Sequence, residues 1–177
     1  MNSERKYSNV DIAKRLDIPR ERLRDWVSRC FVFARDREAT GQRTKAIFSR
    51  LDVYGIALFD FLVKERCFSL EKATKFTKLW FRTMSGVASR TNNSYIEQQK
   101  KSDRFNVLIF MDISTPIGKE LVCEPVGIYG QKESEEGFHF FKALGGILKD
   151  KLKDKPWDDV FVVNIGKIKR QVDAQLS

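Results

Sequence analysis

The N-terminal part of the chain contains two short amphipathic helix patterns separated by a proline. Ser8 is followed three residues later by Asp11, the spacing of a helix-capping pair. Apolar residues then recur at helical spacing until Asp17-Ile18-Pro19 interrupts them after barely two turns. Pro19 suits the first position of a new helix because its missing N–H costs nothing there. Two short helices joined by a tight turn constrain the fold more than any other feature.

The second helix pattern, over about residues 19–29, combines an apolar side with basic flanks. Its apolar positions follow the i, i+3, i+4, i+7 spacing of a buried helix face: Leu23, Trp26, Val27 and Cys30. Its flanks carry four arginines: Arg20, Arg22, Arg24 and Arg29. Glu21 and Asp25 lie most directly opposite the apolar side. This pair of helices has the outline of a helix-turn-helix.

The next segment predicts a β-hairpin followed by two longer helices. Short apolar runs at 31–33 and 46–48 bracket a polar stretch, which predicts a hairpin or wing over about residues 33–47. This stretch holds four basic residues: Arg35, Arg37, Arg43 and Lys45. A second capping pair, Ser49 and Asp52, predicts a helix to about Glu65 with an apolar face of Val53, Ile56, Ala57 and Phe61. Ser69 caps a fourth helix.

The positive charge of the chain is concentrated in its first half. Of the net charge of +9, residues 1–85 contribute +8, from 19 Lys+Arg and 11 Asp+Glu. Residues 86–177 contribute +1, from 14 and 13. Lysines and arginines that bind phosphates release condensed counterions, so this asymmetry favours a polyanionic partner for the first half.

The sequence predicts an α+β protein with an N-terminal winged helix-turn-helix domain and a small C-terminal α+β domain. The domains are residues 1–85 and 104–177, and the polar residues 86–103 form a linker or a connecting helix. The C-terminal domain is expected to contain strands near 107–113, 120–129 and 160–168 and one main helix near 135–153. We expect it to serve oligomerisation, partner contact or sensing of a small ligand.

No motif of catalysis, metal binding or cofactor binding is found in the sequence. Cys30, Cys67 and Cys123 lie far apart and are predicted to be buried apolar residues, and His139 is predicted to be a half-buried helix residue. There is no spacing typical of a zinc site, no phosphate-binding loop and no nucleophile elbow. There is also no secretory signal and no apolar stretch of membrane-spanning length. We therefore expect a cytoplasmic protein that is not an enzyme and binds no cofactor.

Residues 7–84 resemble the mercury-resistance-regulator (MerR) family of bacterial transcription factors. The matching residues are Tyr7, Ser8, Val10, Ile12, Ala13, Ile18, Leu23, Arg24, Trp26, Phe48, Ser49, Asp52, Val53 and Phe68-Ser69-Leu70-Glu71. The chain departs from the family at Asp25, where the family has an aromatic residue, at Cys30, where it has glycine, and at Ala46, where it has the wing arginine.

The resemblance implies a dimeric, sequence-specific regulator of transcription that binds double-stranded DNA. It also implies a protein of bacterial or phage type that is associated with the nucleoid. Helix 19–29 would enter the major groove and the wing would follow the backbone. The DNA-binding residues would be Ser8, Arg20, Arg22, Arg24, Arg29, Arg35, Arg37, Arg43 and Lys45. Two alternatives remain open. One is an architectural factor of excisionase or partition type, and the other is a protein-interaction adaptor that has lost DNA contact, which Asp25 and Ala46 would favour.

Overall fold

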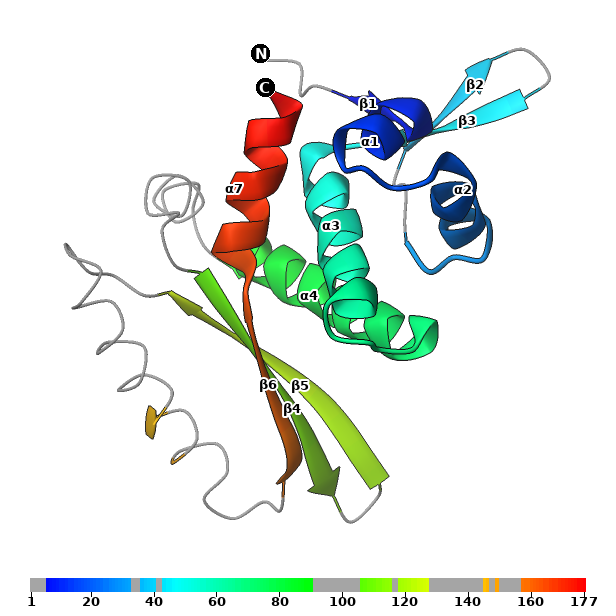
Figure 1. Cartoon of the computed structure of the whole chain (residues 1–177). Helices are drawn as coiled ribbons and strands as arrows, with labels where there is room; N and C mark the ends of the chain where they lie inside the picture. Colours follow the sequence, from blue (N-terminus) through cyan, green and yellow to red (C-terminus); the bar gives the residue numbers. More distant parts are fainter. Residues whose placement is uncertain are drawn as a thin grey trace. The chain divides into compact units, whose positions relative to one another are not determined.

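The computed structural model of the protein combines helices and strands, in agreement with the α+β class. It describes residues 6–32, 36–40, 43–90, 106–115, 118–127, 145–146, 149 and 157–177. The chain divides into two compact units. The first consists of Met1–Thr77 together with Ile168–Ser177, and the second consists of Lys78–Lys167. The first unit is therefore built from both ends of the chain (Figure 1).

The first unit opens with the short strand β1 (Tyr7–Ser8) and helix α1 (Asn9–Arg15). The predicted capping pair is confirmed: Asp11 N–H donates to Ser8 Oγ at 3.3 Å, and Ser8 N–H donates to the Asp11 carboxylate at 2.9 Å. After α1, Asp17 adopts a left-handed conformation with φ 52°, and Ile18 N–H donates to the Ala13 carbonyl at 3.0 Å. These features turn the chain sharply into the next helix.

Helix α2 (Arg20–Ser28) follows this turn within one residue of its predicted start. Pro19 precedes the first helical residue rather than occupying it. At the other end of α2, Cys30 is left-handed with φ 58° and Phe31 N–H donates to the Trp26 carbonyl at 2.9 Å. Cys30 is exposed, and so is Cys67 after α3, so the predicted burial of both is wrong. The helical spacing that placed Cys30 on the apolar face no longer applies, because α2 has already ended.

Strands β2 (Asp36–Thr40) and β3 (Arg43–Phe48) form the predicted hairpin, which extends away from the helices of the first unit (Figure 1). β1 pairs with the other side of β3 through Tyr7 and Phe48, giving an antiparallel sheet in the order β1-β3-β2. No sequence pattern predicts this third strand. It joins the start of α1 to the base of the hairpin.

Helices α3 (Arg50–Lys64) and α4 (Leu70–Arg90) complete the predicted set of four. The capping pair of Ser49 and Asp52 is confirmed at the start of α3. Leu58, Phe59 and Leu62 of α3 are fully buried, whereas Ala57 and Phe61, predicted for the apolar face, are only half-buried. The buried face of α3 is therefore wider than the predicted stripe and is centred closer to Phe59. Helix α4 continues past the predicted domain boundary at residue 85.

The second unit contains an antiparallel sheet of β4 (Asn106–Thr115), β5 (Gly118–Gly127) and β6 (Trp157–Asn164). Its order is β5-β4-β6, and Phe110 of β4 pairs with Cys123 on one side and Phe161 on the other. All three predicted strands are therefore present. In the predicted helix 135–153, the described residues Gly145, Gly146 and Lys149 are helical. His139 and residues 91–105 lie outside the described residues.

A helix that was not predicted, α7 (Ile165–Leu176), follows β6. The last strand was expected to reach Ile168 but ends at Asn164, whose side-chain oxygen accepts a hydrogen bond from Lys167 N–H at 2.9 Å. Asparagine oxygens commonly accept such bonds at helix starts. Ile165 and Ile168 extend the apolar run of the strand in the sequence, but they are also spaced as one face of a helix. The prediction of a strand to Ile168 is therefore wrong.

The C-terminal part of α7 packs with the first unit instead of the predicted domain 104–177. Ile168, Val172 and Leu176 form its buried side. Asp173 accepts hydrogen bonds from Arg50 Nε at 2.9 Å and from the Tyr54 hydroxyl at 2.6 Å, both on α3. Arg15 of α1 also donates to the backbone carbonyl of Gln175 at 2.6 Å. Helix α7 is thus bonded to both α1 and α3, although these two helices are far from it in the sequence.

Candidate nucleic-acid interface

The inner side of α2 is anchored in the core of the first unit. Leu23 and Trp26 are 0% and 2% exposed. The Trp26 ring meets the Phe59 ring of α3 edge-on, with centroids 4.9 Å apart, and Phe31 stacks against Phe59 with a centroid separation of 6.3 Å. Such close packing fixes the rotation of the helix about its axis. The same set of residues on α2 is therefore always presented to solvent.

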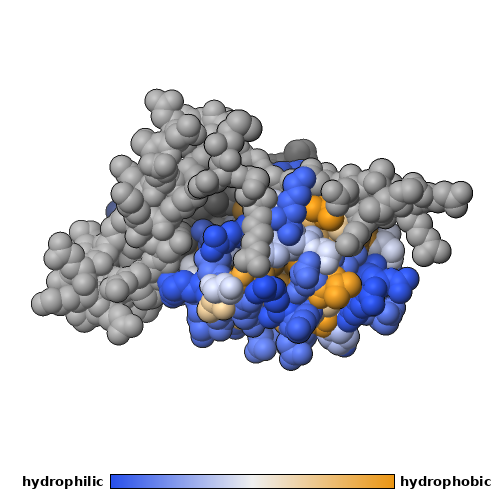
Figure 2. Space-filling model, turned by 90° about the horizontal axis from the view of Figure 1, so that it is seen from above, coloured by the Kyte–Doolittle hydropathy of each residue, from blue (hydrophilic) through white to orange (hydrophobic). Residues whose placement is uncertain are grey.

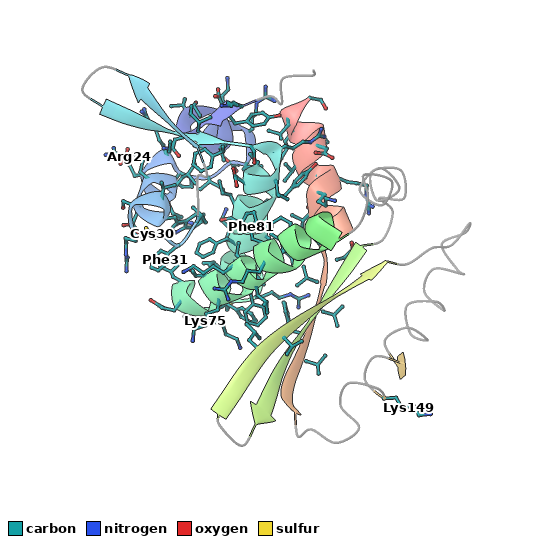
Figure 3. The ribbon with its side chains drawn as sticks, turned by 180° about the vertical axis from the view of Figure 1, so that it is seen from behind. Arg24, Cys30, Phe31, Lys75, Phe81 and Lys149 are labelled. Atoms are coloured by element: carbon teal, nitrogen blue, oxygen red, sulfur yellow. The ribbon has the colours of Figure 1, made fainter. Side chains whose placement is uncertain are left out.

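The outer side of α2 is charged with both signs. Its exposed residues are Arg20, Glu21, Arg22, Arg24, Asp25, Ser28 and Arg29. Arg24 Nη1 lies 3.1 Å from Glu21 Oε2, and Arg29 Nη1 lies 3.5 Å from Asp25 Oδ2. Figure 3 shows Arg24 on the outer side of α2, with Cys30 and Phe31 at the end of the same helix. Four of the predicted DNA-binding arginines are thus gathered on one exposed helix.

These four arginines differ in how they are held. Within the described part of the chain, Arg20 makes no hydrogen bond or ion pair, and Arg24 pairs only with Glu21. Arg29 pairs with Asp25 and also lies over the Phe31 ring, 4.7 Å from its centroid. Exposed ion pairs contribute only about 0–1 kcal/mol, so a competing anion or base can replace one readily. Arg20 and Arg24 are the most available of the set.

Arg22 lies on the flank of α2 where it meets α3. It acts electrostatically on Asp60 of α3, which also forms an ion pair with Lys64 at 2.9 Å. Burial raises the pKa of the Asp60 carboxyl above its ordinary value, while Lys64 and Arg22 oppose that rise. Arg22 therefore has a role within the first unit as well as an exposed side chain.

The basic residues of the hairpin are located by the register of its backbone. Arg37 pairs with Ala46, Glu38 with Lys45 and Thr40 with Arg43. Arg37, Arg43 and Lys45 thus lie within one two-stranded element directly after α2, while Arg35 lies outside the described residues. The pairing of Glu38 with Lys45 adds an acidic residue to this basic element.

Ser8 is the N-cap residue of α1. Its hydroxyl donates to Asp11 Oδ2 at 2.6 Å and accepts from Asp11 N–H at 3.3 Å. A serine hydroxyl has one proton, and contact with a phosphate oxygen would need it. The residue that was expected to bind DNA is therefore already used in capping α1.

The two ion pairs along α2 were missed by the sequence analysis. Glu21 and Arg24 are three residues apart, and Asp25 and Arg29 are four apart. Residues at these spacings are neighbours on a helix, so the pairs were detectable once helix 19–29 had been predicted. Two of the four exposed arginines, Arg24 and Arg29, are thus paired with carboxylates of the same helix.

One face of the molecule shows the character of its described surface. Seen from above, its described residues are mainly hydrophilic, with hydrophobic side chains in small patches between them (Figure 2). Among the described residues, no group of three or more His, Cys, Asp or Glu could hold a metal ion. No helix in the described ranges is long and apolar enough to cross a membrane.

Comparison with known proteins assigns the chain to no family. No protein-family model matches the chain, and a search of curated proteins found no match. The resemblance of residues 7–84 to the MerR family therefore stays a prediction from the individual residues named above.

Proposed function

We propose that the protein binds double-stranded DNA through a winged helix-turn-helix, with α1 and α2 as the two helices and β2–β3 as the wing. The observation that carries this proposal is the two-sided construction of α2. Leu23 and Trp26 hold the helix in the core, while Arg20 and Arg24 are exposed near its N-terminal end. The major groove of B-DNA admits one α-helix, and the N-terminal residues of a recognition helix contact the base edges.

The wing is proposed to follow the phosphate backbone beside the groove. Arg37, Arg43 and Lys45 lie on its two strands, and Arg35 immediately precedes the first. Arginine and lysine contacts to phosphates fix the register of a protein on a duplex without reading its sequence. The charge of +8 in residues 1–85 supports such a contact, because phosphate binding depends on released counterions.

We further propose that the protein acts as a homodimer on a palindromic or repeated site and regulates transcription. The second unit, Lys78–Lys167, would supply the dimer contact or bind a protein partner or small ligand. The mass of the protein in solution, with and without its selected duplex, tests the dimer. A monomer on a single half-site would contradict it.

Selection from random duplexes, followed by fluorescence anisotropy over a range of salt concentrations, tests DNA binding. We expect a selected site to bind with a steep dependence on salt. The double variant Arg20→Ala/Arg24→Ala should weaken binding at least about 10-fold, because a bidentate arginine–guanine contact is worth about 1–3 kcal/mol. Lys167→Ala is the matched control, since this lysine is exposed and lies on α7. Equal losses in both variants would contradict the assignment of α2 to the groove.

A protein-interaction adaptor is the second candidate, and the ion pairs along α2 favour it. Glu21 and Asp25 place two carboxylates among the exposed arginines, an arrangement that also suits a protein partner of mixed charge. The salt series separates the candidates. Weak binding to every duplex, with little dependence on salt, would support the adaptor and exclude DNA binding.

A further inference from the structure

We propose that Glu21 and Arg24 act together as one base-reading unit, selective for a cytosine next to a guanine. This inference rests on the proposed function and adds the kind of base that α2 recognises. The unit is a carboxylate and a guanidinium from the same helix, joined by the Arg24 Nη1–Glu21 Oε2 contact of 3.1 Å.

The pair is exposed enough to meet a partner without rearrangement. The side chains of Arg24 and Glu21 are 63% and 79% exposed. Guanidinium has five N–H donors and a carboxylate accepts at about four positions, so one mutual contact leaves most of both groups unused. The contact also holds the two long side chains beside one another, which lowers the entropy lost when they bind.

The two groups complement different base edges in the major groove. A carboxylate only accepts hydrogen bonds, and the amino groups offered there are those of cytosine and adenine. Arginine only donates, and guanine offers two acceptors, N7 and O6, in the geometry of its fork. Glutamate accepting from cytosine and arginine donating to guanine are both established pairings.

The distance between the Arg24 guanidinium and the Glu21 carboxylate limits how far apart the two contacted bases can lie. Their contact of 3.1 Å is close to the rise of about 3.4 Å from one base to the next. The two contacts are therefore assigned to adjacent base pairs. We assign the selected element as a guanine contacted by Arg24 and a cytosine one step away contacted by Glu21.

Electrostatics also gives Glu21 a specific role. A carboxylate on a helix that enters the groove is repelled by the phosphates, so it weakens binding to any duplex on which it finds no donor. A cytosine amino group offsets this repulsion on the correct site alone. Glu21 thus lowers the affinity for wrong sequences more than for the right one.

The second pair on α2 has a different geometry. Arg29 and Asp25 are 3.5 Å apart, and Arg29 is also held over the Phe31 ring at the C-terminal end of the helix. That end lies away from the N-terminal residues that contact bases in this type of motif. Base selection is therefore assigned to Glu21 and Arg24 rather than to Asp25 and Arg29.

The test is duplex selection with the full chain and its Glu21→Gln and Glu21→Ala variants, followed by affinities for the selected site and for sites changed at single positions. For the unchanged protein we expect a guanine with a neighbouring cytosine, whose replacement weakens binding about 5- to 150-fold. Glu21→Gln should shift the preference at the cytosine position to adenine, because glutamine pairs with adenine through two hydrogen bonds. Glu21→Ala should lose preference at that position and keep the guanine.

Glu71→Gln is the matched control, because it removes a carboxylate from an exposed position on α4. It should leave the selected sequence unchanged. Circular dichroism melting of each variant verifies that it is folded. If Glu21→Ala selects the same sequence as the unchanged protein and binds all duplexes more tightly, Glu21 is only a repelling charge and this inference is wrong while DNA binding stands. If the unchanged protein selects no duplex, the proposed function fails first and the inference fails with it.

Discussion

The nine residues of α2 are divided between an inner and an outer side that differ in burial and charge. On the inner side, Leu23 and Trp26 are almost completely buried and Trp26 packs against Phe59. On the outer side, Glu21 and Arg24 form an ion pair that is largely exposed. Burial of apolar surface stabilises a fold, whereas an exposed ion pair contributes little to stability. The comparison indicates that this helix separates its structural residues from the residues available for recognition.

The largest expected effect comes from the inner side. Trp26→Ala should lower the free energy of unfolding by about 3–5 kcal/mol, because it removes a buried ring and leaves a cavity beside Phe59. Arg24→Ala, two residues earlier, should change it by no more than about 0.5 kcal/mol. Urea unfolding followed by circular dichroism measures both. Similar losses for the two variants would break the distinction between the two sides.

A smaller effect is expected where α7 supports α3, the helix that holds α2 in place. Asp173→Asn should cost about 1 kcal/mol, because Asp173 accepts from both Arg50 and the Tyr54 hydroxyl in a partly exposed position. Gln171→Ala, at an exposed position of the same helix, is the matched control and should be close to neutral. The same urea experiment applies. If Asp173→Asn left the free energy of unfolding unchanged, the bonds from α7 to α3 would not contribute to the stability of the unit that holds α2.

The C-terminal end of α2 offers a change in the opposite direction. Cys30→Gly should stabilise the protein by about 0.5–1 kcal/mol, because φ 58° strains every residue with a Cβ and the exposed thiol loses little packing. Ser28→Gly lies inside the helix and should destabilise by a similar amount, since glycine is unfavourable in a helix interior. Thermal melting compares the two. Destabilisation by Cys30→Gly would contradict the strained conformation.

The flank of α2 predicts a small dependence on pH. Because the pKa of Asp60 is raised in the folded protein, the folded state holds this proton more tightly than the unfolded chain does. The contribution of Asp60 to stability therefore falls as pH rises from about 3.9, the ordinary value, through the raised pKa, and is constant above it. Asp60→Asn should remove this part of the dependence and raise the melting temperature at pH 7 by on the order of a few degrees at most. Parallel urea titrations of both proteins from pH 4 to pH 7 measure the difference, and identical slopes would contradict it.

Features determined by neighbouring residues could be predicted from the sequence. Both capping pairs, Ser8 with Asp11 and Ser49 with Asp52, form as the spacing predicts. The start of α2, within one residue, and the presence of the hairpin also agree with the sequence patterns. Capping, helical periodicity and proline placement act over three or four residues, and the sequence contains all that they need.

Other features of the candidate site could not be predicted in the same way. The burial expected for Cys30 failed because the helix ends two residues earlier, in a left-handed turn that the periodicity does not reveal. Ser8 was correctly predicted to cap α1. That its hydroxyl donates its one proton to Asp11 is seen only in the structure. The Glu21–Arg24 ion pair could have been predicted from the sequence, since its two residues are three positions apart on a helix.

The sequence alone predicted the order of the elements from α1 to α4, the apolar and charged sides of α2 and the concentration of positive charge in residues 1–85. Only the tertiary structure showed that the chain's last helix belongs with its first. The bonds that hold it join Tyr54 to Asp173 and Arg15 to Gln175, across 119 and 160 residues. The physical reason is the range of the interactions: helix starts and amphipathic faces follow from adjacent residues, whereas the partner of a buried face is set by which distant surface it fits.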